Sequence, residues 1–232
     1  MNNILFVIPA RSGSKGIKNK NIQNCANETL LRRSVKICKT IDFPSDIYVS
    51  TDNQEYLDHI NDLIVNAPTL RPKNISGDLI GDIEVLTHAF HTCEKYYKKN
   101  YQCIVMIQPT SPLRKKEHII KSIEAIISEN FDSAVTCHKV DKKYHPLKSL
   151  TLNKSNKLIH YLEIEEEIIA RQQLKETFIR NGACYAITPR QLCEGKTFFK
   201  GNTKLILTDQ LVSIDNIEEL KLCEKILLKN NE

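Results

Sequence analysis

The sequence of 232 residues contains no tryptophan, and phenylalanine and tyrosine bring the aromatic share to only 6%. Proteins that bind nucleic acid usually place aromatic side chains within a basic stripe, so this composition argues against nucleic acid as a partner. An RNA-binding protein remains the rival, and it predicts affinity that falls steeply with salt. The net charge of +5 is a mild excess, which suits a phosphorylated small ligand.

Long apolar runs are also missing. The longest, such as Ile4–Ile8 and Ile104–Ile107, are far shorter than the ~20 residues that cross a bilayer, so no membrane span is expected. Met1 to Asn3 lack the basic residues that begin a signal peptide. The eight cysteines form no C-x-x-C pair, which predicts reduced core residues in a cytoplasmic protein.

Short β-branched runs alternate with segments of helical period, and this rhythm predicts an α/β fold with a mainly parallel sheet flanked by helices. We expect strands at Ile4–Pro9, Asp46–Ser50, Cys103–Gln108, Ser133–Lys139, Ala183–Ile187 and Lys204–Leu207. We expect helices at Leu30–Thr40, Gln54–Asn61, Ile83–Lys98, Lys115–Glu129 and Ile217–Lys229. The rhythm stops between residues 144 and 169, which predicts an inserted arm within a single domain of residues 1–232.

Only seven glycines occur, yet Gly13 and Gly16 fall in one loop directly after the first strand. Ligands of open α/β sheets bind at the carboxyl ends of strands, and glycines there let backbone N–H groups surround phosphate. The same loop carries four cations: Arg11, Lys15, Lys18 and Lys20. Neither a Walker A sequence nor a Rossmann fingerprint fits the loop. The spacing predicts a phosphate site, and a basic surface turn is the alternative.

Residues 8–22 resemble the signature loop of cytidylyltransferases that activate acidic keto-sugars, specifically the acylneuraminate (CMP-sialic acid) synthetases. Seven further motifs follow in the family's order along nearly the whole chain: Val49-Ser-Thr-Asp52, Arg71-Pro72 with Asp78, Gln108-Pro-Thr-Ser-Pro-Leu-Arg114, His145-Pro-Leu-Lys148, Arg171-Gln-Gln-Leu174, Asn181-Gly-Ala-Cys-Tyr185 and Ser213-Ile-Asp215. The resemblance implies a Rossmann-like nucleotide-diphospho-sugar transferase fold and a homodimer formed through the arm.

The resemblance also implies a reaction. CMP would pass from CTP to the C2 hydroxyl of a nonulosonic acid, an acidic nine-carbon keto-sugar, with Mg²⁺ assistance and release of pyrophosphate. N-acetylneuraminic acid is the first expectation for the sugar. Legionaminic, pseudaminic and 3-deoxy-manno-octulosonic acids are the alternatives, and a nucleotide-binding homologue that has lost catalysis is another.

The family's site residues map onto this sequence by motif. The nucleotide positions are Arg11, Ser14, Lys15, Lys20, Asn21 and Arg71. The catalytic positions are Arg11, Lys15, Lys20 and Asp215. The sugar positions are Gln108, Ser111, Lys148, Arg171, Gln172, Asn181, Tyr185, Phe198 and Phe199. In the family, the arm lysine and the phenylalanine pair reach across from the partner subunit.

Some of these positions have a structural alternative. Arg171 suits the sugar carboxylate because a guanidinium can bind it through two parallel hydrogen bonds. Adjacent aromatics such as Phe198-Phe199 more commonly pack in a core. Arg71 could instead bridge to a carboxylate such as Asp78.

The metal site departs from the family, which usually has Asp-Ile-Asp where this chain has Ser213-Ile214-Asp215. Asp215 is therefore the one expected Mg²⁺ ligand from this motif, and another acid such as Asp209 or Asp82 could supply a second. Since Mg²⁺ often binds through one or two carboxylates plus substrate phosphates and waters, activity need not be lost.

A few polar residues have local interpretations. His88 and His91 have a spacing that can chelate a metal, but no third ligand is evident and a solvated helix face is the alternative. Asp52 either touches ligand or caps the helix expected at Gln54, and Thr29 is expected to cap the helix at Leu30.

Overall fold

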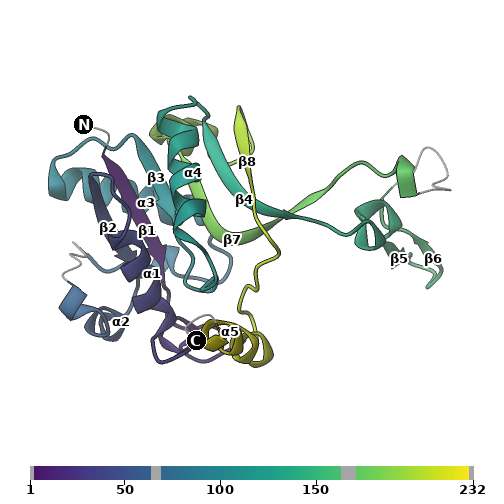
Figure 1. Cartoon of the computed structure of the whole chain (residues 1–232), viewed down its shortest axis with the longest axis horizontal. Coiled ribbons are helices and arrows are strands. Elements are labelled where there is room, and N and C mark those ends of the chain that lie inside the picture. Colours follow the sequence, from purple (N-terminus) through teal and green to yellow (C-terminus); the bar gives the residue numbers. More distant parts are fainter. Residues whose placement is uncertain (1–2, 64–68, 163–170, 230–232) are drawn as a thin grey trace.

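The computed structural model describes residues 3–63, 69–162 and 171–229 (Figure 1). Its strands are β1 (Ile4–Pro9), β2 (Ser45–Ser50), β3 (Cys103–Met106), β4 (Ser133–Lys139), β5 (Leu150–Leu152), β6 (Leu158–His160), β7 (Phe178–Ile187) and β8 (Thr203–Leu207). Its α-helices are α1 (Leu30–Lys39), α2 (Gln54–Asp58), α3 (Asp82–Tyr97), α4 (Lys116–Ile127) and α5 (Ile217–Lys229). Within these residues, no helix is long and apolar enough to cross a bilayer.

A six-stranded sheet in the order β2-β1-β3-β7-β4-β8 forms the centre of the molecule. β1 runs parallel to β2 and β3, and β4 runs parallel to β8. β7 runs antiparallel to both of its neighbours, β3 and β4. The predicted α/β fold with a mainly parallel sheet is therefore confirmed, and a single reversed strand separates its two parallel parts.

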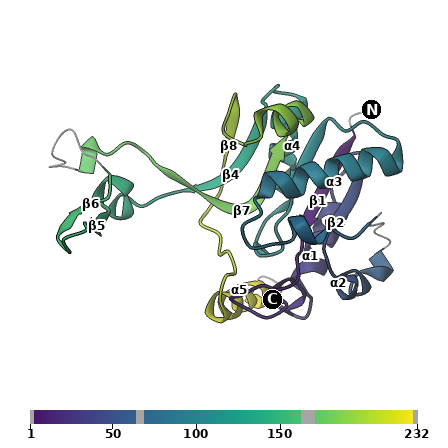
Figure 2. The ribbon, with the colours of Figure 1, turned by 180° about the vertical axis from the view of Figure 1, so that it is seen from behind.

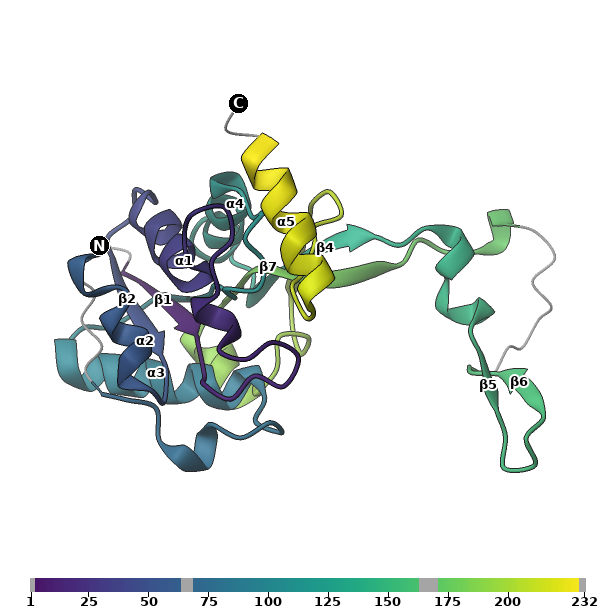
Figure 3. The same ribbon diagram turned by 90° about the horizontal axis from the view of Figure 1, so that it is seen from below.

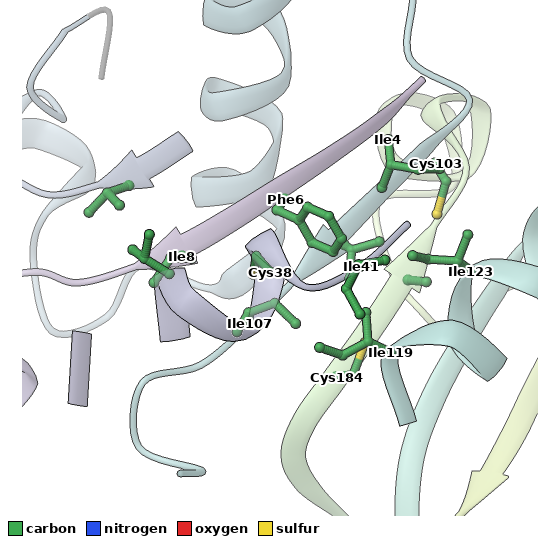
Figure 4. Close-up of a cluster of buried hydrophobic side chains, with 14 of the residues drawn as sticks. Ile4, Phe6, Ile8, Cys38, Ile41, Cys103, Ile107, Ile119, Ile123 and Cys184 are labelled. Atoms are coloured by element: carbon green, nitrogen blue, oxygen red, sulfur yellow. The ribbon is translucent and has the colours of Figure 1, made fainter. Parts of the chain in front are cut away.

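Both faces of the sheet are covered, which explains why β1 is an uninterrupted apolar run. Ile4, Phe6 and Ile8 point to the face covered by α1 and α4 (Figure 4), whereas Leu5 and Val7 point to the face covered by α3. Figure 2 shows α3 lying across β1 and β2. Strands that are buried on both faces lose the polar alternation of a half-exposed sheet.

A third apolar cluster joins the two ends of the chain. Ile17, Cys25 and Leu30 pack against Ile214 and the inner face of α5. Figure 3 shows α5 beside the segment that follows β1. This packing holds the N-terminal loop and residues 214–215 next to each other.

The eight cysteines are all free, and each is buried except Cys193, which is partly exposed. Burial raises the pKa of the Cys184 thiol to about 12, so this group stays protonated at neutral pH. The prediction of reduced cysteines in the core is confirmed for seven of the eight.

Between β4 and β7 the chain leaves the sheet and forms an arm (Figure 1). The arm contains the hairpin of β5 and β6. The exposed apolar side chains among its described residues are Tyr144, Leu150, Leu152, Leu158, Ile159, Tyr161 and Leu162. A monomeric protein rarely exposes so many large apolar side chains on one small element.

The element boundaries differ from the predictions in a few places. α2 ends at Asp58 and not at Asn61. β7 begins at Phe178, five residues before the predicted start. Its first three residues are all exposed, so they show no alternation of buried and exposed positions from which a strand could be predicted. The predicted cap at Thr29 is confirmed, since its hydroxyl accepts a hydrogen bond from the Arg32 N–H at 3.2 Å.

Candidate functional site

A cavity of about 390 Å³ opens where β1 and β3 end. It is lined by Pro9, Arg11, Ser14, Lys15, Gly16, Lys20, Asn21, Arg71, Ile80, Asp82, Val85, Gln108, Pro109, Thr110, Ser213 and Asp215. All six predicted nucleotide positions are among these residues. The cavity lies at the carboxyl ends of parallel strands, where ligands of open α/β sheets bind.

The N-terminal loop is closed against the C-terminal segment on one side of this cavity. A Cβ atom on Gly16 would lie 2.3 Å from the Asp215 carbonyl oxygen, so only glycine fits there. The Lys20 ammonium donates to the Ile214 carbonyl at 2.9 Å and pairs with the Asp215 carboxylate at 3.0 Å. The Ile214 N–H in turn donates to the Thr110 carbonyl at 2.8 Å, which ties this segment to the loop after β3.

Two further cations of the loop share one carboxylate. Asp78 Oδ1 lies 2.7 Å from Arg11 Nη1, and Asp78 Oδ2 lies 2.6 Å from Lys15 Nζ. The Lys15 and Arg11 cations hold the pKa of Asp78 below its ordinary value. The proposed bridge from Arg71 to Asp78 is therefore wrong, because Asp78 binds the loop cations instead.

Arg71 also lines the cavity and is buried, with 4% of its surface exposed. Its backbone N–H donates to the Thr51 carbonyl at 2.7 Å. Its side-chain Nε and Nη2 have no hydrogen-bond partner among the described residues. Burial lowers the pKa of this guanidinium, and the nearby Arg11 lowers it further. Since buried donors are rarely left unpaired, these two donors indicate a position for a ligand's acceptor atoms.

Asp52, which follows β2, supports the loop after β1. Its carboxylate accepts the Ser12 N–H at 2.7 Å and the Ser12 hydroxyl at 2.9 Å. Burial opposes ionisation, but these hydrogen bonds outweigh it and hold the pKa of Asp52 below its ordinary value. Of the two alternatives for Asp52, the helix cap is excluded, because Asn53 caps α2 by accepting the Glu55 N–H.

On the predicted sugar side, the loop after β3 meets β7. The Ser111 hydroxyl donates to the Asn181 carbonyl at 2.9 Å. A Cβ atom on Gly182 would lie 2.3 Å from Gln108 Oε1, and Gly182 has a φ of +70° that favours glycine. Of these residues, only Gln108 lines the cavity. Asn181 is buried, and its amide donates to the Thr208 hydroxyl at 2.7 Å.

The predicted aromatic positions divide between core and surface. The Tyr185 hydroxyl accepts the Gly182 N–H at 3.0 Å, and its ring meets that of Phe198 edge to face. Both rings belong to the apolar cluster under α3, so the core interpretation holds for Phe198. Phe199 is exposed and lies against the guanidinium of Arg180.

The predicted arm residues do not reach the cavity of their own chain. Lys148 ends a short 3-10 turn in the arm, and Gln172 lies in a second one, Arg171–Gln173. Both side chains are exposed, and Figure 1 places the arm well away from the ends of β1 and β3. The side chain of Arg171 lies outside the described part of the chain.

The cavity offers two carboxylates that could bind a metal, Asp215 and Asp82. The Asp215 side chain is 78% exposed. Burial raises the pKa of the Asp82 carboxyl, and the positive charge of Arg180 opposes this rise. No group of three or more ligating side chains occurs in the described residues. Oxygen ligands of this kind fit a Mg²⁺ ion that also binds substrate phosphates. Asp209, the other acid considered, does not line the cavity.

The histidines on α3, His88 and His91, do not line this cavity. His91 Nε2 is 4.0 Å from the Cys193 sulfur, a neighbour that the sequence did not indicate. His88 has a lowered pKa because it is partly buried and faces Arg71.

Sequence reasoning missed several residues that line the cavity, namely Ile80, Val85 and Thr110. Ile80 and Val85 flank the start of α3, and their apolar side chains carry no chemical signal. Two indications were available: Ile80 lies two residues after the Asp78 of a recognised motif, and Thr110 lies within the motif Gln108–Arg114.

Comparisons with known proteins agree with this geometry. A family profile described as cytidylyltransferase matches residues 5–230. The chain is 27% identical to the CMP-N,N'-diacetyllegionaminic acid synthase of Legionella pneumophila, covering 99% of this chain and 98% of that protein. It is 24% identical to the N-acylneuraminate cytidylyltransferase of Escherichia coli, covering 91% of this chain and 48% of that protein.

A solved structure of a CMP:2-keto-3-deoxy-manno-octonic acid synthetase complexed with CTP has the same fold. Its TM-score is 0.73 at 12% sequence identity, over 99% of this chain and the whole of that one.

Proposed function

The chain belongs to the cytidylyltransferase family, and we propose that it transfers CMP from CTP to the C2 hydroxyl of a nonulosonic acid, releasing pyrophosphate. The observation that carries this proposal is a cavity lined by the three loop cations Arg11, Lys15 and Lys20 together with Arg71, whose Nε and Nη2 have no partner among the described residues. A nucleoside triphosphate presents both the phosphate charge and the acceptor atoms that these groups require.

The reaction forms a bond from the sugar oxygen to the α-phosphorus and breaks the bond from that phosphorus to the bridging oxygen of pyrophosphate. Negative charge grows on the departing oxygen, so cations already in position lower the barrier. Arg11 and Lys15 suit the departing phosphates. Lys20 is 15% exposed and fixed by two partners, so it suits a position beside the α-phosphate.

Mg²⁺ would bind through Asp215, with Asp82 as a second ligand. When bound, it neutralises phosphate charge and orients the triphosphate. The chain itself holds the backbone of Asp215 in place, because Gly16 packs against the Asp215 carbonyl and Ile214 packs against the apolar face of α5.

The sugar is proposed to bind beside Gln108, next to the junction of the β3 loop with β7. Relatives named for legionaminic and N-acylneuraminic acids both match this chain at similar identity. We propose N-acetylneuraminic acid as the first substrate to test and legionaminic acid as the second.

The arm is proposed to complete the site of a second copy. Lys148 and Gln172 are exposed on the arm, at a distance from the cavity of their own chain, and the apolar hairpin side chains offer a surface that a dimer would bury. A homodimer in which each arm reaches the partner's cavity would bring these polar side chains to a sugar.

Two experiments test these proposals. Pyrophosphate release is measured with CTP, Mg²⁺ and each of a panel of nonulosonic acids. Turnover with at least one sugar is expected, and CTP binding without turnover on the whole panel would favour a non-catalytic homologue.

The second experiment mixes two inactive variants, Arg11→Ala and Lys148→Ala. If the arm serves the partner's site, mixed dimers contain one site with both residues intact, and part of the activity returns. No recovery after subunit exchange would contradict the shared site.

A further inference from the structure

Asp78 is an acid placed on the cations of the phosphate loop. It lies between the 3-10 turn η3 (Lys73–Ile75) and α3, on a different segment from the loop. Each of its oxygens holds one cation, Arg11 at 2.7 Å and Lys15 at 2.6 Å. Within the described residues, these are the ion pairs that Arg11 and Lys15 make. The carboxylate thus occupies the two cations in the way that two oxygens of a phosphate would.

These contacts are easily exchanged for others. The Lys15 side chain is 82% exposed and that of Asp78 is 36% exposed, so both can move into water without losing buried contacts. Leu79, the next residue, is 99% exposed, so the described chain does not cover this segment. Exposed ion pairs are worth little, and a ligand with more charge can replace them.

Lys20 behaves differently. It is largely buried, and it is held by the Ile214 carbonyl as well as by the Asp215 carboxylate. Among the loop's four cations, Lys20 is therefore fixed by two partners, whereas Arg11 and Lys15 share the single carboxylate of Asp78.

We propose that Asp78 is an internal competitor for the phosphates that leave in the reaction. This role rests on the proposed function. A triphosphate or pyrophosphate must displace Asp78 from Arg11 and Lys15, whereas a monophosphate leaves Asp78 paired with both cations. After transfer, Asp78 returns to the two cations and weakens their hold on pyrophosphate. Asp78 thereby determines how strongly the cavity distinguishes ligands by the number of their phosphates. It also speeds the release of pyrophosphate.

Calorimetric binding of pyrophosphate and of CMP, with Mg²⁺ present, tests this proposal in the full chain. Asp78→Asn keeps the shape of the side chain but removes its charge. We expect pyrophosphate to bind roughly three- to tenfold more tightly to this variant, because two exposed ion pairs no longer compete. CMP affinity should stay within about twofold, since CMP does not displace the side chain. An equal gain for CMP would indicate a general field effect and overturn the proposal.

Asp62→Asn is the matched control. Asp62 pairs with Arg32 outside the cavity, and its loss changes the net charge by the same amount. This variant should bind pyrophosphate as the wild type does. Asp78→Ser serves as a second variant if Asp78→Asn does not fold, with the same expected gain.

The possible results separate the two proposals. Pyrophosphate binding that is unchanged or weaker in the Asp78 variants overturns the competitor role and assigns Asp78 to holding the cations in place. If the wild type binds neither CTP nor pyrophosphate, the proposed function fails as well. Tighter pyrophosphate binding together with stronger product inhibition in turnover supports the competitor role.

Discussion

Lys20 and Asp215 are 195 positions apart in the sequence, yet their side chains pair at 3.0 Å on the wall of one cavity. The pair joins the loop after the first strand to the segment before the last helix. Lys20 is mostly buried while Asp215 is mostly exposed, so the ammonium is the fixed partner. A ligand can therefore draw Asp215 toward a metal without dislodging Lys20.

Replacing Lys20 should reduce catalysis far more than stability. Lys20→Met keeps the apolar stem of the side chain but removes the fixed charge, and we expect kcat to fall roughly 100- to 1,000-fold. The melting temperature should change little. Lys18→Met, an exposed position on the same loop, is the control and should keep near wild-type turnover. Steady-state kinetics and thermal melting check both, and equal kcat values would remove Lys20 from the site.

Gly16→Ala should disturb the site through the backbone. The added Cβ would lie 2.3 Å from the Asp215 carbonyl, and a backbone atom cannot rotate away as a side chain can. We expect a loss of about 1–3 kcal/mol in unfolding free energy and a marked fall in activity. Gly77→Ala is the control, because its Cβ would meet nothing closer than an Ile80 carbon at 3.9 Å. Denaturant titration distinguishes them, and equal stability would contradict the close contact.

The metal requirement can be tested at the shortened acidic motif. If Asp215 binds Mg²⁺, Asp215→Asn should nearly abolish turnover while CTP binding is largely kept. Ser213 also lines the cavity, so Ser213→Asp should lower the Mg²⁺ concentration needed for half-maximal rate. Titration of Mg²⁺ against rate decides the matter. No change with Ser213→Asp and a mild effect of Asp215→Asn would exclude this metal site.

The Asp52 carboxylate should make stability depend on pH in acid. Its pKa in the folded chain is depressed, so its contribution is present above the unfolded pKa of about 3.9 and is lost as pH falls through the folded value. Asp52→Asn should therefore flatten the fall of melting temperature below about pH 4. Ser12→Ala, which keeps the N–H bond, should give part of the same effect. Parallel curves for wild type and Asp52→Asn would contradict the linkage.

The core strands of the fold could be predicted because their residues are buried on both faces. The run from Ile4 to Pro9 is apolar at every position, which indicates a central strand. The start and the direction of β7 could not be predicted in the same way. Its first residues, Phe178 to Arg180, are exposed, and its antiparallel direction depends on an arm whose path the local sequence does not specify.

The candidate site could likewise be predicted only in part from the sequence. The loop cations could be located because glycines and charges gather directly after a strand, whereas Arg71 was assigned through the resemblance to the family's motif. The partners of these residues were harder to predict. Asp78 lies within a recognised motif but binds Arg11 and Lys15, not Arg71, since ion pairing between loops depends on their relative position in space. The role of Asp52 stayed open between ligand contact and helix cap, because the sequence does not distinguish it from the neighbouring Asn53, which caps α2.

The length of β7 has a mechanical consequence. The strand runs from Phe178, where the arm joins, to Ile187 in the core, but its register with β4 shifts between Arg180 and Tyr185, where Gly182 lies beside Gln108. An irregularity of this kind bends a strand, so it sets the direction in which the arm leaves the sheet. The first three residues, Phe178–Arg180, pair regularly with β4, so a single residue inserted among them would turn the arm-side residues to the other face of the sheet. The spacing between arm and pocket is therefore under the same constraint as the pocket itself, and variation in arm length is tolerated only outside this strand.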